Sequence, residues 1–175
     1  MTATVFVGTS LDGFIARRDG RFDFLPTEVE PHGFDEFLAS VDAIVMGRNT
    51  FETVMGMEGW FYGRKRLIVL SSRPLDLAAA RERGGVVEQM SGEPADIAAA
   101  LAASGAHHLY VDGGDTIHRF LRAGLIHRFI ITRVPVLIGE GIPLFGSLAH
   151  DVRLEHVATR AFPSGLVQSE YRVVP

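Results

Sequence analysis

A chain of 175 residues with 47% hydrophobic and 22% charged residues has the size and composition of one compact domain with a normal core. Its net charge of −4 argues against a surface for nucleic acid or anionic membrane, because either partner attracts a basic patch. The absence of cysteine excludes disulfides, thiolate metal sites and cysteine nucleophiles. The N-terminus shows no signal-peptide pattern and no apolar run approaches ~18 residues, so we expect a cytoplasmic protein.

The first part of the chain predicts a strand, a turn, a long loop and a short helix. Residues 2–8 contain an unbroken apolar run that is typical of a strand covered on both faces. Asp12 and Gly13 fall in the turn that follows. Residues 17–32 show no period and contain two prolines, which indicates a lid or a binding loop. Apolar residues then recur with helical spacing over 34–41.

The next segment predicts a strand, a tight turn and the start of a helix. Residues 43–46 form an apolar run typical of a buried strand, and Gly47 allows the backbone to turn sharply. The free N–H groups of the helix start, together with Arg48 and the Thr50 hydroxyl, suit a phosphate group. The alternative is an ordinary strand–turn–helix junction with a solvated arginine.

The rest of the chain alternates between predicted strands and helices. Strands are expected at 67–70, 86–88, 108–112 and 127–134, helices at 76–83, 95–104 and from Asp115 or Thr116 as cap to Gly124, a loop at 139–146, and a hairpin with arms near 152–162 and 166–174. This pattern predicts a single α/β domain over residues 1–175, with a mostly parallel sheet of about eight strands that ends in an antiparallel hairpin.

Small or polar residues follow three of the predicted strands. These segments are Gly47-Arg48-Asn49-Thr50, Ser71-Ser72-Arg73 and Gly113-Gly114-Asp115-Thr116. Because the carboxyl ends of strands line the ligand crevice of an open α/β sheet, we expect the three segments to converge on one phosphorylated nucleotide. Each segment taken alone is also what any α/β protein contains.

Other chemistries fit the sequence less well. Seven histidines are scattered, and the adjacent pair His107-His108 points to opposite faces of a strand, so we predict no metal site. Lys65 is followed by arginine where a P-loop requires serine or threonine. No serine lies in a nucleophile-elbow pattern.

Several ordered motifs resemble those of the dihydrofolate reductase superfamily, and most closely its riboflavin-biosynthesis reductase-domain branch. The general motifs are Val45-Met46-Gly47-Arg48-Asn49-Thr50-Phe51-Glu52, the run from Gly63 to Pro74, and Val111-Asp112-Gly113-Gly114. The motifs similar to the riboflavin branch are Ser10-Leu11-Asp12-Gly13-Phe14-Ile15-Ala16 and Gly141-Ile142-Pro143-Leu144-Phe145. The similarity covers nearly the whole chain and implies a dihydrofolate-reductase-like three-layer α/β/α fold with an eight-stranded sheet.

The resemblance implies an NADPH-dependent oxidoreductase, similar to 5-amino-6-(5-phosphoribosylamino)uracil reductase or to dihydrofolate reductase. Its substrate is expected to be a small heterocyclic, ribitylamino- or pterin-like compound. Gly8 and Ile15 are expected to approach the nicotinamide ring. The remaining cofactor-binding residues that the resemblance implies are Gly47, Arg48, Asn49, Thr50, Ser71, Ser72, Arg73, Gly113, Gly114, Asp115 and Thr116.

The resemblance is weaker where the substrate is expected. No acid fits cleanly at the place of the folate reductases' protonating carboxylate. Phe24, Arg64 and Thr132 are the expected substrate-binding residues, and Asp12 is the best remaining candidate for a catalytic acid. To act near neutral pH, Asp12 needs burial against apolar neighbours that raise its pKa. The alternative is that Asp12 is a turn residue that only hydrogen-bonds nearby backbone.

Two other functions remain open from the sequence: an NADPH- or nucleotide-binding module without turnover, and a regulatory subunit that responds to NADPH or flavin. We also expect a homodimer, since the riboflavin branch commonly pairs and the apolar segment 127–138 continues past a normal strand length. If Val134 to Ile138 projects from the domain, it needs a partner surface. The alternative is that it packs under the 17–32 loop.

Overall fold

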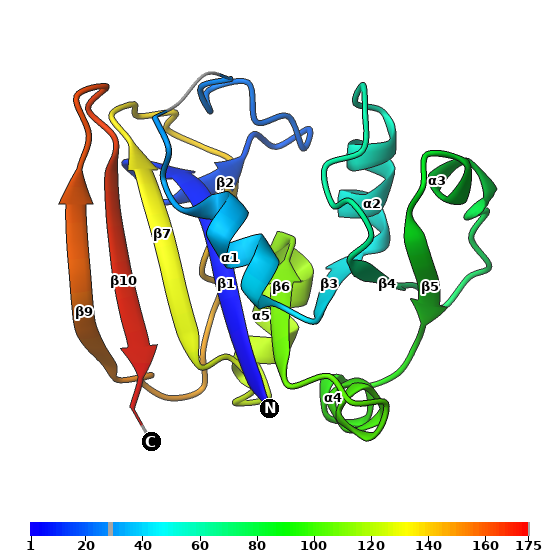
Figure 1. Ribbon diagram of the computed structural model, residues 1–175. Helices are drawn as coiled ribbons and strands as arrows, with labels where there is room; N and C mark the ends of the chain where they lie inside the picture. The colour runs from blue at the N-terminus through cyan, green and yellow to red at the C-terminus, as the bar shows by residue number, and fades with distance from the viewer. Residues whose placement is uncertain (28–29, 175) are drawn as a thin grey trace.

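Eight strands form one continuous sheet, in the order β5-β4-β3-β6-β1-β7-β10-β9 (Figure 1). The computed structural model describes residues 1–27 and 30–174. The strands of this sheet are β1 (Thr2–Ser10), β3 (Ala43–Gly47), β4 (Arg66–Leu70), β5 (Val86–Met90), β6 (His108–Asp112), β7 (Arg128–Val134), β9 (Leu154–Ala161) and β10 (Val167–Val173). Two short strands pair separately, β2 (Phe14–Ala16) and β8 (Ile142–Pro143). Residues 142–143 therefore form a strand inside the segment predicted as a loop.

The sheet is parallel from β5 to β7 and antiparallel at its other edge. β10 pairs antiparallel with both β7 and β9, so the C-terminal hairpin completes the sheet as predicted. The helices connect the parallel strands and are α1 (Phe34–Ser40), α2 (Arg48–Met55), α3 (Ala78–Glu82), α4 (Pro94–Ala103) and α5 (Gly114–Arg122). Among the described residues, no helix has the length and apolar character of a membrane span.

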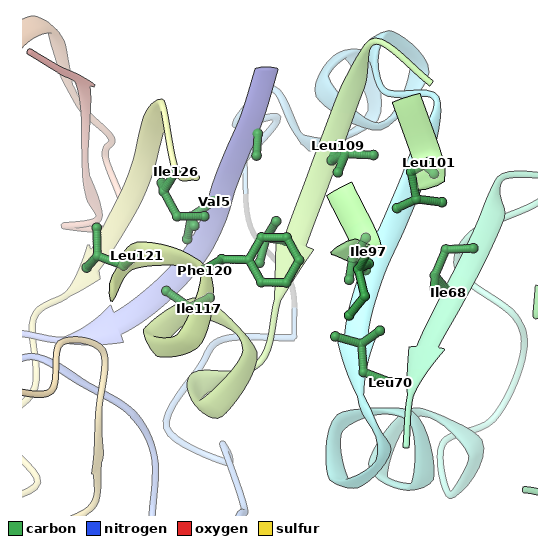
Figure 2. Packing of buried hydrophobic residues seen from close by; sticks show 14 of the residues in the cluster. Val5, Ile68, Leu70, Ile97, Leu101, Leu109, Ile117, Phe120, Leu121 and Ile126 are labelled. Atoms are coloured by element: carbon green, nitrogen blue, oxygen red, sulfur yellow. The ribbon is translucent and has the colours of Figure 1, made fainter. Parts of the chain in front are cut away.

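Helices cover both faces of the sheet, and each face has its own core. Both cores receive side chains from β3, because its residues 43–46 are fully buried and alternate between the two faces of the sheet. Ile44 and Met46 pack with α1, α2 and α3 on one face. Val45 packs with α4 and α5 on the other face, where Phe120 lies at the centre of the cluster (Figure 2). The three-layer dihydrofolate-reductase-like fold predicted from the sequence is confirmed.

The sheet opens between β1 and β6 near the carboxyl ends of the strands. These two strands are paired from Thr2 and His108 to Thr4 and Tyr110. Beyond that point β1 continues beside β7, while β6 continues beside β3 to Asp112. The chain leaves β1 through α1 toward β3 and leaves β6 through α5 toward β7, so the connections run in opposite directions. Such a point of reversal is where open α/β sheets bind ligands.

The segment predicted to need a partner surface follows β7. Val134 is buried at the end of the strand, and Val136 accepts a hydrogen bond from the Leu11 backbone N–H at 2.8 Å. Leu137 is 69% exposed, and Leu11 beside this segment is 56% exposed. β9, at the edge of the sheet, is exposed along its whole length. These exposed surfaces are candidates for a dimer interface, and the homodimer stays a prediction for measurement in solution.

Candidate active site

A groove of about 930 Å³ runs along the carboxyl ends of β1, β3, β4 and β6. One wall comes from residues 20–25 together with Phe34, and the other comes from α2 and the loop that follows it. Its lining includes every residue that the sequence analysis assigns to the cofactor: Gly8, Ile15, Gly47, Arg48, Asn49, Thr50, Ser71, Ser72, Arg73, Gly113, Gly114, Asp115 and Thr116. The fold therefore brings the three predicted strand ends to one place, while cofactor binding itself stays a prediction.

Two helices begin at this groove without side-chain caps. The N-cap of α2 is Gly47 and the N-cap of α5 is Gly113, and neither helix start receives a side-chain cap hydrogen bond. The predicted caps Asp115 and Thr116 instead lie within the first turn of α5. The first N–H groups of a helix have no partner within the helix, and the helix dipole favours an anion there. The groove therefore offers two converging sets of backbone donors.

Glycine allows the two helix starts to approach each other. Gly113 has φ +88°, in the left-handed region, and a Cβ added to it lies 2.3 Å from Thr50 Oγ1. A Cβ added to Gly47 lies 3.1 Å from Thr116 Oγ1. The threonine of each helix thus packs on the N-cap glycine of the other, and side chains larger than hydrogen at residue 113 separate the helices.

Three arginines line one end of the groove, which we call the arginine half. Arg48 Nε lies 2.7 Å from Glu52 Oε1 one turn along α2, and Arg119 donates to the Gly92 carbonyl at 2.8 Å. Arg73 is exposed in the turn after β4. The Ser71 hydroxyl donates to the Arg73 carbonyl at 2.7 Å and accepts from its N–H at 3.2 Å. Ser71 thereby shapes this turn, and Ser72 presents the exposed hydroxyl.

In the middle of the groove, the lining includes two glycines, Gly8 on β1 and Gly114 at the start of α5. A Cβ added to Gly8 lies 2.9 Å from Leu25 Cδ2, so the 17–27 segment packs directly against β1. A Cβ added to Gly114 lies 2.9 Å from Ile15 Cδ1 and 3.3 Å from Ile142 Cγ2. Ile15 from β2 therefore covers the start of α5, and Gly8 and Ile15 flank a narrow space between β1 and α5.

Aromatic side chains line the other end, which we call the aromatic half. Its lining contains Phe6, Phe22, Phe34, Phe61, Tyr62 and Tyr110, supplemented by Leu25, Val54 and Met57. The Phe6 and Phe34 ring centroids are 5.3 Å apart, and those of Phe34 and Tyr110 are 6.2 Å apart. The Tyr110 hydroxyl donates to the Phe6 carbonyl at 3.0 Å. Burial raises the pKa of both Tyr62 and Tyr110, so both phenols are neutral.

Asp112, at the end of β6, is the carboxyl group of the aromatic half. Burial raises the pKa of Asp112 to about 6, although the Gly113 N–H and the Tyr110 hydroxyl act in the opposite direction. Gly113 N donates to Asp112 Oδ1 at 2.8 Å. The residue keeps partial exposure where it meets the groove. Asp112 was not among the predicted catalytic residues, although an acid that ends a buried strand before two glycines is a signal for such a group.

Asp12 does not meet the condition of burial that a catalytic acid needs in order to act near neutral pH. Asp12 is exposed and lies outside the groove lining, and it accepts hydrogen bonds from the backbone of Ile138 at 3.3 Å and Gly139 at 2.8 Å. A hydrogen bond from the Ser10 side chain and these two backbone bonds lower the pKa of Asp12. Its carboxylate connects the 10–13 turn to the 138–139 loop, which is the turn role given as the alternative.

The predicted substrate-binding residues lie away from the groove lining. Phe24 packs under the Arg17 guanidinium, whose carbon is 6.0 Å from the ring centroid, while its neighbours Phe22 and Leu25 line the groove. Arg64 is exposed in the turn before β4. Thr132 is buried beside Gly8, and its hydroxyl accepts from Gln168 Nε2 at 3.0 Å.

The described residues contain no group of three histidine, aspartate or glutamate side chains that could hold a metal ion. The groove itself offers backbone hydrogen-bond donors, three arginines and the carboxyl groups of Glu93, Asp112 and Asp115. It suits a long ligand with an anionic end in the arginine half and a flat apolar end in the aromatic half.

Comparison with known proteins places the fold in a family. The model of the RibD C-terminal domain family matches residues 2–168. The uncharacterized protein YwjB of Bacillus subtilis (strain 168) is 31% identical over 162 residues, which cover 90% of each chain. A structure from Shewanella sp. PV-4, provisionally named as a riboflavin biosynthesis protein, is 36% identical, with a TM-score of 0.90 over 100% of both chains.

A more distant structure is similar in fold. Dihydrofolate reductase from Enterococcus faecalis, complexed with NADP(H) and RAB-propyl, is 19% identical, with a TM-score of 0.68 over 99% of this chain and 97% of that one. At this identity the likeness concerns the fold alone. Together with the family match, it confirms the resemblance inferred from the motifs.

Proposed function

The chain belongs to the RibD C-terminal domain family, and on that premise we propose that it is an NADPH-dependent reductase of a small heterocyclic, ribitylamino- or pterin-like compound. The family supports a reductase-like role related to riboflavin biosynthesis. The observation that carries the proposal is the meeting of two uncapped helix starts across Gly113, in a groove that also contains three arginines. A pyrophosphate between two nucleosides needs such donors at the middle of an elongated site.

The arginine half fits the phosphate groups of NADPH. The N–H groups at the starts of α2 and α5 would hold the pyrophosphate. Arg48, Ser72 and Arg73 would hold the 2′-phosphate of the adenosine, since all three line the groove where β3 and β4 end. Arg48 could exchange its ion pair with Glu52 for a bond to the phosphate, because exposed ion pairs contribute little free energy.

The other residues of the groove would prepare the reaction. When bound, NADPH supplies the hydride from its nicotinamide ring. Gly8 and Ile15 would orient that ring between β1 and α5, and Leu25 with Phe34 would exclude water from it. The Asp112 carboxyl would hold a proton on Oδ2, because Oδ1 accepts the Gly113 N–H. A carboxyl with a pKa of about 6 can donate that proton to substrate near neutral pH.

A cofactor titration tests the nucleotide half of this proposal. We expect the protein to bind NADPH at least about tenfold more tightly than NADH, since charge-assisted contacts contribute about 1.5–3 kcal/mol each before screening. Arg48→Ala should remove most of the preference and leave NADH affinity nearly unchanged. Arg122→Ala is the matched control, since Arg122 is exposed on α5 and lies outside the groove lining. Equal affinity of the wild type for both cofactors would remove the role of Arg48.

The competing function is an NADPH-binding module without turnover. Turnover assays of the wild type and of an Asp112 variant distinguish the two functions. A reductase should oxidise NADPH in the presence of a substrate from a pterin and ribitylamino-pyrimidine panel, followed at 340 nm. Asp112→Asn should keep NADPH affinity and lose most turnover, and wild-type turnover should fall as pH rises past the pKa of about 6. NADPH binding without oxidation across the panel supports the module instead.

A further inference from the structure

The two halves of the groove differ in charge, and this difference limits what can bind next to the nicotinamide. The charged side chains of the lining are Arg48, Arg73, Glu93, Asp112, Asp115 and Arg119. All three arginines belong to the arginine half, on α2, the turn after β4 and α5. In the aromatic half, the charged group of the described lining is the carboxyl of Asp112.

Cations near the aromatic half are engaged elsewhere. Arg17 forms a two-point ion pair with Asp23, at 2.6 and 3.1 Å, and Arg21 pairs with Asp19 at 2.7 Å. Lys65 donates to the carbonyls of residues 39 and 41, at 2.9 and 2.6 Å. These contacts hold the three cations outside the groove lining.

Two further basic side chains, those of His32 and Arg64, also lie outside the groove lining. His32 packs its ring against Phe6, with centroids 5.7 Å apart, and its Nδ1 lies 3.3 Å from the Glu30 carbonyl. Arg64 is exposed in the turn before β4, outside the groove lining. A dianionic group placed among these aromatic side chains would therefore lose its hydration without gaining an opposite charge, and it would also face Asp112.

We infer that the compound reduced in the aromatic half is a flat, uncharged heteroaromatic ring without a phosphate group, held between aromatic side chains and offering an N–H or amino donor to the Asp112 carboxyl. This inference rests on the proposed function and specifies its substrate class. Stacked or edge-on rings fill such a slot well, and a ring donor satisfies the carboxyl when it is ionised. The groove thus separates its ligands by charge, with phosphates in the arginine half and a neutral ring in the aromatic half.

A matched pair of compounds tests the inference. The probes are 5-amino-6-(5-phosphoribosylamino)uracil and the same compound after removal of its phosphate, with 6-methylpterin as a second uncharged ring. Each is titrated into NADPH-loaded protein, and NADPH oxidation is followed in parallel. We expect the unphosphorylated compound to bind at least about tenfold more tightly than its phosphate, because an unpaired buried charge is strongly unfavourable.

A cation added to the wall should reverse this discrimination. Phe61 lines the groove and is 47% exposed, so Phe61→Arg places a guanidinium at the aromatic half with little risk to the core. We expect the phosphorylated compound to gain affinity in this variant, and Phe61→Leu to leave the discrimination in place. Met57→Arg, on the same wall and 36% exposed, is the second variant if Phe61→Arg does not fold.

The outcomes separate this inference from the proposed function. The NADPH titration is done first, and its failure contradicts the proposed function and the inference with it. If NADPH binds and the phosphorylated compound binds as well as or better than the unphosphorylated one, the inference is wrong and the proposed function stands. Failure of NADPH-loaded protein to bind any of the three probes at millimolar concentration also overturns the inference.

Discussion

Replacing Asp112 with asparagine should stabilise the folded protein, and the gain should grow with pH. The pKa of the carboxyl rises from 3.8 to about 6 on folding, so the folded state favours the protonated form. Below pH 3.8 the group is protonated in both states and adds no cost. As pH rises further the unfolded chain releases its proton first, so stability falls until the folded carboxyl also ionises. These pKa values give a cost of about 1 kcal/mol at pH 4.5 and about 3 kcal/mol at pH 8.

Asparagine carries no charge and keeps an oxygen that can accept the Gly113 N–H. Because Asp112 meets the groove on one side, solvent reduces the expected gain to about 1–3 kcal/mol at pH 8. Urea unfolding of the wild type and Asp112→Asn at pH 4.5 and pH 8 measures it. Asp96→Asn, at an exposed position in the first turn of α4, is the control. A gain that is the same at both pH values, or a loss of stability at pH 8, refutes the reasoning.

Three further predictions concern the groove, the Asp12 turn and assembly. Gly113→Ala should abolish measurable NADPH binding in a fluorescence titration, because the added Cβ meets Thr50. Gly124→Ala is the control, since Gly124 also has a positive φ but lies outside the groove lining, and this variant should retain binding. Equal loss of binding in both variants contradicts the role of Gly113. Asp12→Asn should leave turnover within about twofold of wild type, since the Asp12 carboxylate only binds the backbone of the 138–139 loop. A loss of turnover above about tenfold in steady-state assays would support Asp12 as the catalytic acid. Light scattering at micromolar concentration should give a dimer that Leu137→Glu weakens, whereas a monomeric wild type removes the homodimer.

Most of the arginine half was predictable because its signals are local in the sequence, whereas Arg119 on α5 was not among the predicted residues. Gly47 and Gly113 each follow a buried strand and precede a helix, and parallel strands present their carboxyl ends at one edge. Arg48 and Arg73 lie within a few residues of those ends. Each element could therefore be placed without knowledge of its neighbours, and the sheet order brings them together.

The aromatic half was not predictable in the same way, since its properties arise between segments. Tyr62, Tyr110 and Asp112 come from two different parts of the chain, and the pKa of Asp112 depends on burial that their packing creates. The same limit applies to Asp12, because the Asp-Gly pattern is compatible with both a turn and a catalytic acid. Only the position of the 138–139 loop decides between these, because its backbone N–H groups bind the carboxylate.

A crystal structure of the protein with bound NADPH is the decisive test of the proposed binding mode. We expect the pyrophosphate at the starts of α2 and α5, the 2′-phosphate beside Arg48 and Arg73, and the nicotinamide ring between Gly8 and Ile15. NADPH bound with its pyrophosphate away from both helix starts, or with its nicotinamide away from the aromatic half, would contradict it.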